Sequence, residues 1–307
     1  MEKTYDVIII GGGVSGFAAA MYAGRFELKT LVIGDTLGGV IITTNEVANY
    51  PGFKMVTGIE LADKIREHAL EYKVDVDTAF TTKCEKTKEG FKVSTSEKSY
   101  LGKTVILATG TKWRKLKVPG EEDFANKGVH YCALCDGAFY KDKVVALVGG
   151  SDSAAKDALV LTQYAKKVFI IYRGKQIHPE PINLRRVEQN KKIEVINETN
   201  VKEIKGEKFV NKLILDKPYK GSEEFAVDAV FIAIGHEPLN ELAKQLGVKL
   251  NGKGEIIIDR HGFTNVEGVY AAGDIVNTEF KQAITGVAEG VTASFNAYNH
   301  LQKQKEK

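Results

Sequence analysis

The chain has 307 residues, of which 43% are hydrophobic and 27% charged, and its formal net charge is +3. This composition is typical of a globular protein with two domains, and so small a net charge gives no reason to expect nucleic-acid binding. No apolar run reaches the roughly 18 residues of a membrane span. Three cysteines without a framework of pairs fit a reducing compartment, and the first strand begins too early for a signal peptide. We therefore expect a cytoplasmic protein that binds neither nucleic acid nor a membrane.

The first predicted unit opens with a strand, a glycine-rich turn and a helix. Residues 6–10 are a continuous apolar run, as in a buried parallel strand, and residues 17–24 are rich in alanine. Between them, residues 11–16 form a GxGxxG motif. Strand before and helix after is the setting that a dinucleotide-binding turn requires, and a plain glycine-rich loop lacks it.

Each residue of this turn has a distinct expected role. Gly11 permits the tight turn, Gly13 lets a pyrophosphate approach the backbone, and Gly16 lets the helix pack on the strand. The helix N-terminus around Val14 and Ser15 offers free N–H groups and a positive dipole end. Residues 11–16 therefore predict a site for the phosphates of a dinucleotide.

The next predicted strand, residues 30–35, ends on Gly34 and Asp35. Asp35 lies 24 positions after Gly11 (35 − 11), near the place where an acidic residue holds a ribose 2′-hydroxyl. It could equally be a turn residue. Residues 38–52 follow as a polar loop too long for a simple turn, and long structured loops often carry function.

The remainder of this unit is predicted from alternating and apolar patterns. We expect a helix over residues 61–70, strands around 74–80 and 91–95, and a buried strand over 104–110 that ends at Gly110. Cys84 has no partner at a recognisable spacing. We interpret it as a structural or surface bystander.

A pair of cysteines follows, Cys132 and Cys135, with two residues between them. Cysteines at this spacing can form a redox-active disulfide, and Asp136 could supply or hold the proton that thiol exchange needs. The pattern is also half of a zinc site, but no second such pair or nearby histidine pair accompanies it, so we expect no metal. His130 is interpreted as a core or loop histidine.

The strand, turn and helix pattern then recurs. A strand over 143–148 leads into residues 149–154 and a helix to about residue 164, and strands over 168–172 and 230–235 follow. The turn reads GxSxxA, with the candidate nucleotide-binding residues Gly149, Ser151, Asp152, Ser153 and Ala154. The same unit thus occurs twice, which predicts an α/β fold of two Rossmann-like dinucleotide-binding domains.

The second unit differs from the first at the position that contacts the ribose. Arg173 lies 24 positions after Gly149 (173 − 149), where the first unit has Asp35. An acid there favours a free 2′-hydroxyl, whereas an arginine can bind a 2′-phosphate. Arg173 is followed by Gly174 and not by a second cation.

The closing segment returns to strand patterning over residues 254–258 and 269–274. Gly273 and Asp274 end the second of these strands, and the Asp274 carboxylate could accept hydrogen bonds from a polyol. Residues 281–301 predict a helix whose first N–H groups could face a polar ring.

Together these stretches resemble the low-molecular-weight thioredoxin reductases over nearly the whole chain. The likeness is carried by residues 11–16, 46–52, 132–137, 235–238, 268–274 and 282–285. It implies FAD in a domain of residues 1–117 and 239–307, and NADH or NADPH in an inserted domain of residues 118–238 that carries the two cysteines. It also implies a homodimer with thioredoxin or a thioredoxin-like protein as its partner.

The resemblance further implies roles for individual residues. Cys135 would face the flavin, Cys132 would attack the disulfide of the protein partner, and Asp136 would be the general acid. The FAD contacts would be Gly11, Gly13, Val14, Ser15, Gly16, Gly34, Asp35, Gly38, Gly39, Val40, Asn49, Gly110, Gly273, Asp274, Lys281, Gln282 and Ala283. The NAD(P)H contacts would be Gly149, Ser151, Asp152, Ser153, Ala154, Tyr172, Arg173, Gly235 and His236. Linkers at about 111–120 and 235–240 would let the inserted domain swing.

The sequence departs from the family pattern at three places. Val40 replaces a usual glutamine, and Ser151 replaces the middle glycine of the second turn. Where NADPH-dependent members carry His-Arg-Arg and a further arginine, this chain has Tyr172, Arg173 and Gly174, and then His178. Because charge-assisted bidentate contacts dominate binding of a 2′-phosphate, we expect NADH to serve at least as well as NADPH. Two alternatives stay open: a flavin enzyme reduced by another donor, such as reduced ferredoxin, and a flavin redox sensor without turnover.

Overall fold

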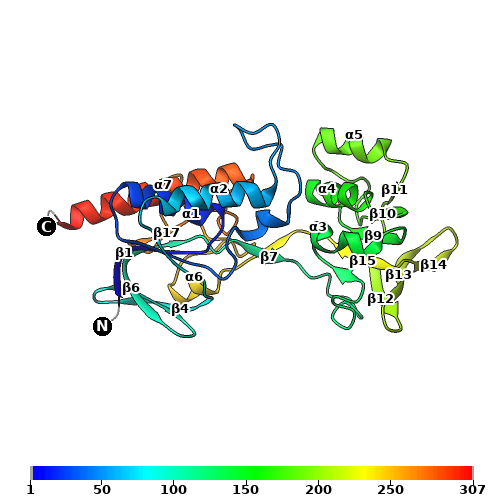
Figure 1. The fold of residues 1–307 in the computed structure, drawn as a ribbon. Coiled ribbons are helices and arrows are strands. Elements are labelled where there is room, and N and C mark those ends of the chain that lie inside the picture. The colour runs from blue at the N-terminus through cyan, green and yellow to red at the C-terminus, as the bar shows by residue number, and fades with distance from the viewer. Residues whose placement is uncertain (1–2, 306–307) are drawn as a thin grey trace. The chain divides into compact units, whose positions relative to one another are not determined.

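The structure, a computed structural model, describes residues 3–305. Two compact units divide the chain: one comprises Met1–Lys112 with Glu237–Lys307, the other Trp113–His236 (Figure 1). These boundaries come a few residues before the expected ones, because Leu116 and Val118 already pack on the core of the second unit.

The first unit is built on a seven-stranded sheet with the order β3-β2-β1-β6-β5-β4, in which β17 also pairs with β6. Strands β1, β2, β3, β6 and β17 are joined by parallel pairings, and β4 and β5 extend the sheet as an antiparallel hairpin. The bounds are β1 Lys3–Ile10, β2 Thr30–Ile33, β3 Asp75–Asp77, β4 Thr81–Thr87, β5 Gly90–Thr95, β6 Ser99–Leu107 and β17 Val269–Ala271.

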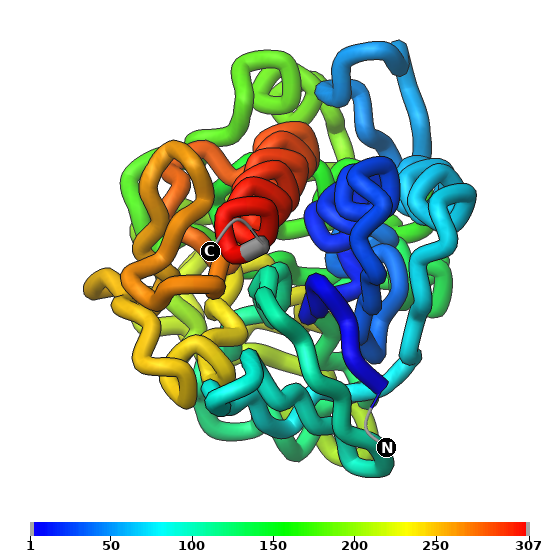
Figure 2. Tube along the Cα trace, turned by 90° about the vertical axis from the view of Figure 1, so that its left-hand side faces the viewer, coloured from blue at the N-terminus to red at the C-terminus, as the bar shows by residue number. Residues whose placement is uncertain are grey.

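Both faces of this sheet are covered, which is why its central strands read as unbroken apolar runs. Ile8 belongs to one hydrophobic cluster and Ile9 to the other, and both side chains are fully buried. Helix α1 (Val14–Arg25) packs against α2 (Gly58–Leu70) and α7 (Ala283–Lys305). Figure 2 shows α1 and α7 side by side. Small residues permit this approach, because a Cβ at Gly290 of α7 would lie 2.2 Å from the Ser15 carbonyl oxygen.

The second unit has a five-stranded parallel sheet with the order β11-β10-β9-β15-β8 and a three-stranded antiparallel sheet β12-β13-β14. Its strands are β8 Val129–His130, β9 Val144–Val148, β10 Lys167–Ile171, β11 Ile193–Ile196, β12 Val201–Gly206, β13 Val210–Tyr219, β14 Ser222–Ala226 and β15 Ala229–Ile232. Its helical segments are α3 Ala133–Asp136, η2 Gly137–Tyr140, α4 Asp152–Leu161 and α5 Pro181–Gln189.

The predicted repetition of one unit is confirmed by the strand orders. In the first unit the parallel strands follow β3-β2-β1-β6-β17, and in the second they follow β11-β10-β9-β15-β8. In each, the strand that precedes the glycine-rich turn is flanked by the next strand of the chain and by a late strand. The fold is therefore α/β with two Rossmann-like halves.

Two details of the closing segment differ from expectation. The strand expected over residues 254–258 is wrong, because Ile256 makes only isolated bridges with Leu250 and Val276. The last helix begins at Ala283 and not at residue 281. The N–H of Gln282, the residue before the helix, donates a hydrogen bond to the Thr285 hydroxyl, as in a cap at a helix start.

The remaining short elements lie near the two crossings of the chain between the units and in the first unit. Strand β7 (Thr111–Trp113) pairs with β16 (His236–Pro238) in a two-stranded sheet. The first unit also contains η1 (Gly39–Thr43) and α6 (Glu241–Gln245). Among the described residues, none of the helices is both long and apolar enough to span a membrane.

Candidate active site

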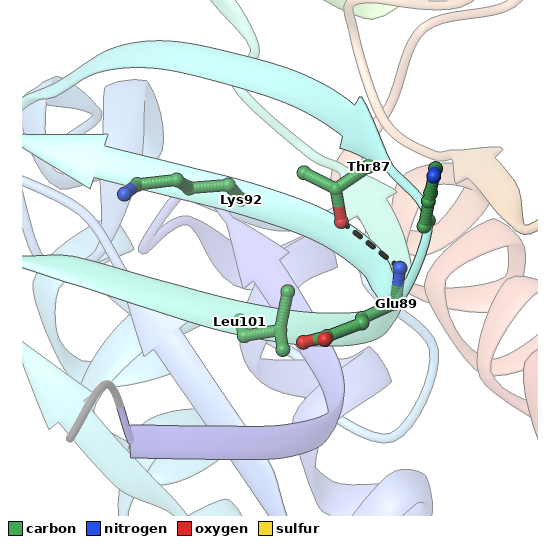
Figure 3. Close-up of a pocket in the computed structure, with 5 residues that line it drawn as sticks. Thr87, Glu89, Lys92 and Leu101 are labelled. Atoms are coloured by element: carbon green, nitrogen blue, oxygen red, sulfur yellow. Dashed lines mark hydrogen bonds between the residues drawn. The ribbon is translucent and has the colours of Figure 1, made fainter.

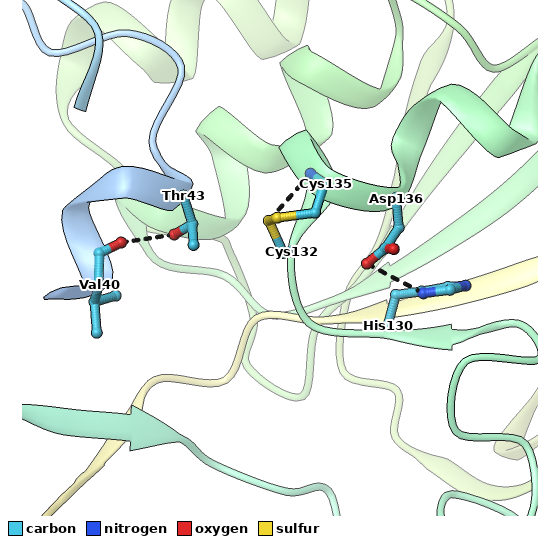
Figure 4. Close-up of a disulfide and its surroundings, with 6 residues drawn as sticks. All are labelled: Val40, Thr43, His130, Cys132, Cys135 and Asp136. Atoms are coloured by element: carbon cyan, nitrogen blue, oxygen red, sulfur yellow. Dashed lines mark hydrogen bonds and ion pairs between the residues drawn. A yellow bond between two sulfur atoms is a disulfide. The ribbon is translucent and has the colours of Figure 1, made fainter. Parts of the chain in front are cut away.

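The two cysteines of the CxxC motif are joined by a disulfide in the second unit (Figure 4). Cys132 precedes α3, and its sulfur accepts a hydrogen bond from the Cys135 N–H at 3.1 Å. The Cys132 side chain is buried, whereas Cys135 is exposed. An N–H directed at a sulfur stabilises the thiolate over the thiol, so Cys132 is the better placed of the two to act as a thiolate nucleophile.

Asp136 ends α3 and lies next to a buried histidine. The Asp136 Oδ2 atom is 3.2 Å from the Nδ1 atom of His130, a close contact whose angle falls short of a hydrogen bond. The other ring nitrogen of His130, Nε2, is hydrogen-bonded to the Tyr140 hydroxyl at 2.7 Å. The acid predicted to serve the dithiol is thus one end of a three-residue chain (Figure 4 shows the His130 and Asp136 end).

The surroundings of His130 are apolar. Its side chain is 5% exposed, and its ring stacks on Phe231 with the ring centroids 5.3 Å apart. Burial lowers the pKa of His130, and the neighbouring Asp136 carboxylate opposes that change. Burial also raises the pKa of Tyr140. At pH 7 His130 is therefore neutral and Tyr140 is protonated.

The glycine-rich turn of the first unit has the geometry of a phosphate cradle. Gly11 has φ +123°, and a Cβ there would lie 2.0 Å from the Ala108 carbonyl oxygen, so only glycine fits. Gly13 precedes α1, which has neither a side-chain cap nor an acidic residue in its first turn. A Cβ at Gly39 would lie 3.0 Å from the Gly13 Cα atom, and Gly13 is bridged to Gly38. Gly11 thus shapes the turn, while Gly13, Gly38 and Gly39 bring no side chain to the uncapped first N–H groups of α1, which suit an anion.

Distant parts of the chain meet beside this turn. The Asn49 side-chain amide donates a hydrogen bond to Gln282 Oε1 at 3.0 Å, across 233 residues. A Cβ at Gly273 would lie 2.5 Å from the Ser15 hydroxyl, which places these two residues in contact. Four of the predicted FAD contacts are therefore paired by the fold.

Lys281 has a different environment from the one expected of a ligand contact. Its ammonium donates to the carbonyl oxygens of Asp274 and Val276 and lies 3.1 Å from the Glu255 carboxylate. These three acceptors use the donors of the ammonium. Lys281 therefore fixes the loop before α7 in the structure.

The other predicted FAD contacts lie at the carboxyl ends of strands or at helix starts. Gly34 packs on the glycine-rich turn, because a Cβ there would lie 2.4 Å from the Gly12 nitrogen, and Asp35 follows it with an exposed side chain. Gly110 has φ +64° and lies between β6 and β7. The remaining positions are Val14 and Gly16 in α1, Val40 in η1, Asp274 after β17 and Ala283 at the start of α7.

The turn of the second unit repeats this arrangement, except that the first turn of its helix carries an acidic residue, Asp152. Gly149 has φ +153°, and a Cβ there would lie 2.2 Å from the Ala233 carbonyl oxygen. Ser151 precedes α4 and does not cap it with its side chain. The Asp152 carboxylate accepts hydrogen bonds from the Glu180 N–H and the Asn183 side chain, at 2.9 and 2.8 Å. Asp152 therefore ties α4 to α5, while Ser153 and Ala154 continue α4.

Tyr172 occupies the space above this turn. A Cβ at Gly150 would lie 2.4 Å from its ring, and a Cβ at Gly174 would lie 2.5 Å from the ring's other edge. The Tyr172 hydroxyl is 3.2 Å from His178 Nδ1. Two glycines thus make room for one aromatic ring, and Arg173 beside it is exposed.

Gly235 and His236 lie where the chain leaves the second unit. Gly235 has φ +95°, and its carbonyl oxygen accepts a hydrogen bond from the Arg114 N–H at 3.0 Å. His236 begins β16. Both are fixed by the pairing of the two chain crossings.

Other candidate positions fall outside these clusters. Cys84 is a free thiol buried in the core of the first unit, and burial raises its pKa to about 12. A pocket at the turn between β4 and β5 is lined by Thr87, Glu89 and Lys92 among others (Figure 3) and contains none of the predicted site residues. Within residues 3–305, no group of three or more His, Cys, Asp or Glu side chains is placed to hold a metal ion.

Sequence reasoning missed His130 and Tyr140 as neighbours of the acid. His130 stands two residues before Cys132, and the sequence pattern predicts only a core or loop histidine there. The available signal was that three polar side chains, His130, Asp136 and Tyr140, flank the cysteine pair within eleven residues (140 − 130 + 1).

Comparisons with known proteins agree with this geometry. Residues 5–290 match the model of the family described as pyridine nucleotide-disulphide oxidoreductase. A thioredoxin reductase of Mycolicibacterium smegmatis is 39% identical, with 99% of this chain and 98% of that protein covered. The crystal structure of Lactococcus lactis thioredoxin reductase is similar with a TM-score of 0.93 and 36% identity, covering 97% of this chain and 99% of that one. The thioredoxin reductase structure from T. acidophilum has a TM-score of 0.92 and 34% identity, with coverage of 98% and 100%.

Proposed function

Because this chain belongs to the pyridine nucleotide-disulphide oxidoreductases, and among them to the low-molecular-weight thioredoxin reductases, we propose that it is an FAD-dependent thioredoxin-disulfide reductase. Electrons pass from NAD(P)H through FAD and the Cys132–Cys135 disulfide to thioredoxin or a thioredoxin-like protein. The observation that carries this proposal is the disulfide at the start of α3, within a Rossmann-like unit that follows a first such unit.

The first unit fits FAD on its own geometry. Gly11 lets the chain turn tightly against Ala108, and Gly13 and Gly39 face one another without side chains, at a helix N-terminus that no side chain in the described structure caps. The residues that would hold FAD include this turn and the paired residues Asn49 and Gln282. When bound, FAD supplies two-electron redox chemistry between a nicotinamide and a disulfide.

The protein's own residues perform the thiol chemistry. After reduction of the disulfide, the Cys135 N–H supports the Cys132 thiolate as it attacks the partner's disulfide. Cys135 then attacks the mixed disulfide and releases the reduced partner. Asp136 moves the proton between the sulfurs.

We also propose that NADH serves at least as well as NADPH. Arg173 is exposed and is the one arginine of residues 172–178, where NADPH-dependent members carry a cluster of arginines, and the neighbouring space is filled by the Tyr172 ring. A single exposed arginine offers a 2′-phosphate little more than a screened contact. Steady-state kinetics with both cofactors test this, and a large kcat/KM preference for NADPH would contradict it.

The test of the proposed activity is NAD(P)H-dependent reduction of thioredoxin by the FAD-loaded protein, followed through the partner's free thiols. The Cys135→Ser variant is the matched control, because it keeps the fold and removes the sulfur that closes the disulfide. Equal thiol release by this variant would refute the mechanism, and absence of thiol release by the parent protein would favour a redox sensor without turnover. If neither nicotinamide bleaches the flavin under anaerobic conditions while reduced ferredoxin does, the donor assignment fails and the alternative is right.

The assembly and location follow from the same resemblance. We propose a homodimer, which light scattering of the purified protein tests directly; a monomer at micromolar concentration would contradict it. We propose a cytoplasmic location, because a dithiol that must return to its reduced form works best where the surroundings are reducing.

A further inference from the structure

We propose that His130 is a positioning residue for thiol exchange, and that His130 and Asp136 share one proton as a single acid–base pair. The proposal rests on the proposed function, in which Asp136 alone would move the proton. It adds a residue outside the CxxC motif.

The contacts around the ring carry the proposal. His130 Nδ1 lies 3.2 Å from Asp136 Oδ2, and Nε2 lies 2.7 Å from the Tyr140 hydroxyl oxygen. The His130 side chain is 5% exposed, whereas that of Asp136 is 28% exposed. One end of the chain of contacts is thus partly open to solvent and its middle is buried; Figure 4 shows Asp136 next to the disulfide in the chain, directly after Cys135.

The chemistry of the partners assigns the ring's proton. An ionised carboxylate only accepts hydrogen bonds, whereas a tyrosine hydroxyl donates or accepts. The neutral ring therefore carries its proton on Nδ1, toward Asp136, and Nε2 accepts from Tyr140. When the ring takes a second proton at Nε2, the Tyr140 oxygen becomes the acceptor.

The elements in contact with His130 differ in the charge that they bring to its ring. Helix α3 contributes Asp136, η2 contributes Tyr140, and β15 contributes the uncharged ring of Phe231. Asp136 is the charged group that acts on the ring, while Asp228 acts on Tyr140. A proton gained by His130 is therefore stabilised chiefly by the Asp136 carboxylate.

The exchange step balances without any other reagent. As the Cys132 sulfur bonds to a sulfur of the partner, the partner's disulfide breaks, and the proton of the Cys132 thiol passes through the pair to the partner's departing sulfur. The Cys135 sulfur then bonds to the Cys132 sulfur, the mixed disulfide breaks, and the proton of the Cys135 thiol passes through the pair to the partner's second sulfur. The partner is reduced to a dithiol, the Cys132–Cys135 dithiol is oxidised to the disulfide, and His130 and Asp136 return to their starting state.

The test measures the reactivity of Cys132 in the holoenzyme and needs neither thioredoxin nor a nicotinamide. In a Cys135→Ser background, the rate of Cys132 alkylation by iodoacetamide is followed by mass spectrometry from about pH 5 to about pH 10. We expect two steps in the parent protein, since coupled sites titrate together. His130→Gln should remove the lower step, because the variant has no ring to take up the proton.

Two further variants decide how His130 acts. If it works through Asp136, His130→Gln added to Asp136→Asn changes the alkylation curve no further. Effects that add in the double variant, or a His130→Gln curve identical to that of its parent, would overturn the proposal. The exposed His68 on α2 is the matched control, and His68→Gln should leave the curve unchanged.

A second variant covers the case in which His130→Gln fails to fold or to hold its flavin. Tyr140→Phe keeps the ring against Phe231 and removes only the hydroxyl. Because the charged form of His130 then loses its acceptor, the lower step should move to lower pH. An unmoved step would overturn the proposal, whereas failure to reduce thioredoxin would refute only the proposed function.

Discussion

The preference for NADH over NADPH can be tested at the proposed nicotinamide-dinucleotide site, because the Tyr172 ring already occupies the space for a second arginine. A Cβ at position 174 would lie 2.5 Å from the Tyr172 ring, and on its opposite side the ring packs directly on Gly150. Gly174→Arg alone must therefore displace Tyr172 from its contact with His178. We expect this single substitution to gain little NADPH selectivity.

The double variant Tyr172→His with Gly174→Arg should behave differently, because it restores the residues of NADPH-dependent members at both positions. A charge-assisted bidentate contact contributes about 1.5–3 kcal/mol, which is about 10- to 150-fold in a ratio of kcat/KM values. Arg173 is exposed, so solvent screening favours the lower end, about tenfold.

Steady-state kinetics with NADH and NADPH measure the ratio for each variant. Gly252→Arg is a matched control for added charge, because position 252 of the first unit has open space around it. If Gly174→Arg alone gains as much NADPH selectivity as the double variant, Tyr172 does not control the site. A wild-type protein that strongly prefers NADPH would refute the reasoning at its first step.

Three other predictions concern the glycine turn and the cysteines. Gly11→Ala should cost several kcal/mol of stability and most FAD affinity, because φ is +123° and the new Cβ would lie 2.0 Å from the Ala108 carbonyl oxygen. Thermal melting measures the stability and flavin titration the affinity. The control Gly252→Ala, at a position with open space and no positive φ, should stay within about 0.5 kcal/mol of wild type. Cys84 should resist iodoacetamide at pH 9 in the folded protein, since burial raises its pKa to about 12. The contribution of the Cys84 thiol to protein stability is fully present below the unfolded pKa of about 8.5 and is lost as pH rises toward 12. Rapid labelling at pH 9 would contradict its burial. Cys132→Ser should abolish thioredoxin reduction while leaving anaerobic flavin bleaching by the nicotinamide intact. Loss of bleaching would mean that Cys132 is needed for reduction of the flavin and would contradict its assignment to thiol exchange.

The sequence predicts those parts of the fold whose signals are local. Continuous apolar runs identify β1, β9 and β15, because strands covered on both faces need no polar side. The glycine turns are predictable for the same reason, since Gly11 and Gly149 must adopt positive φ and lie between a strand and a helix. These short-range requirements are enough to reveal the repeated unit.

Other features depend on packing that no local pattern encodes. The position of His130 is set by the pairing of β8, two residues long, with β15, which puts its ring on Phe231. Tyr172 fits its place because Gly150 and Gly174, on either side of it in space, lack side chains. Ile256 reads as part of a strand because it is buried, although isolated bridges with Leu250 and Val276 hold it.

The most direct test of the account is to follow the flavin and the two sulfurs in one anaerobic experiment. The purified yellow protein is mixed with NADH or NADPH, quenched with an alkylating agent, and its cysteines are mapped by mass spectrometry. We predict that flavin bleaching is accompanied by labelling of Cys132 and Cys135 while the buried Cys84 stays unlabelled. A bleached flavin beside an intact Cys132–Cys135 bridge, or a purified protein that holds no flavin, would contradict the account.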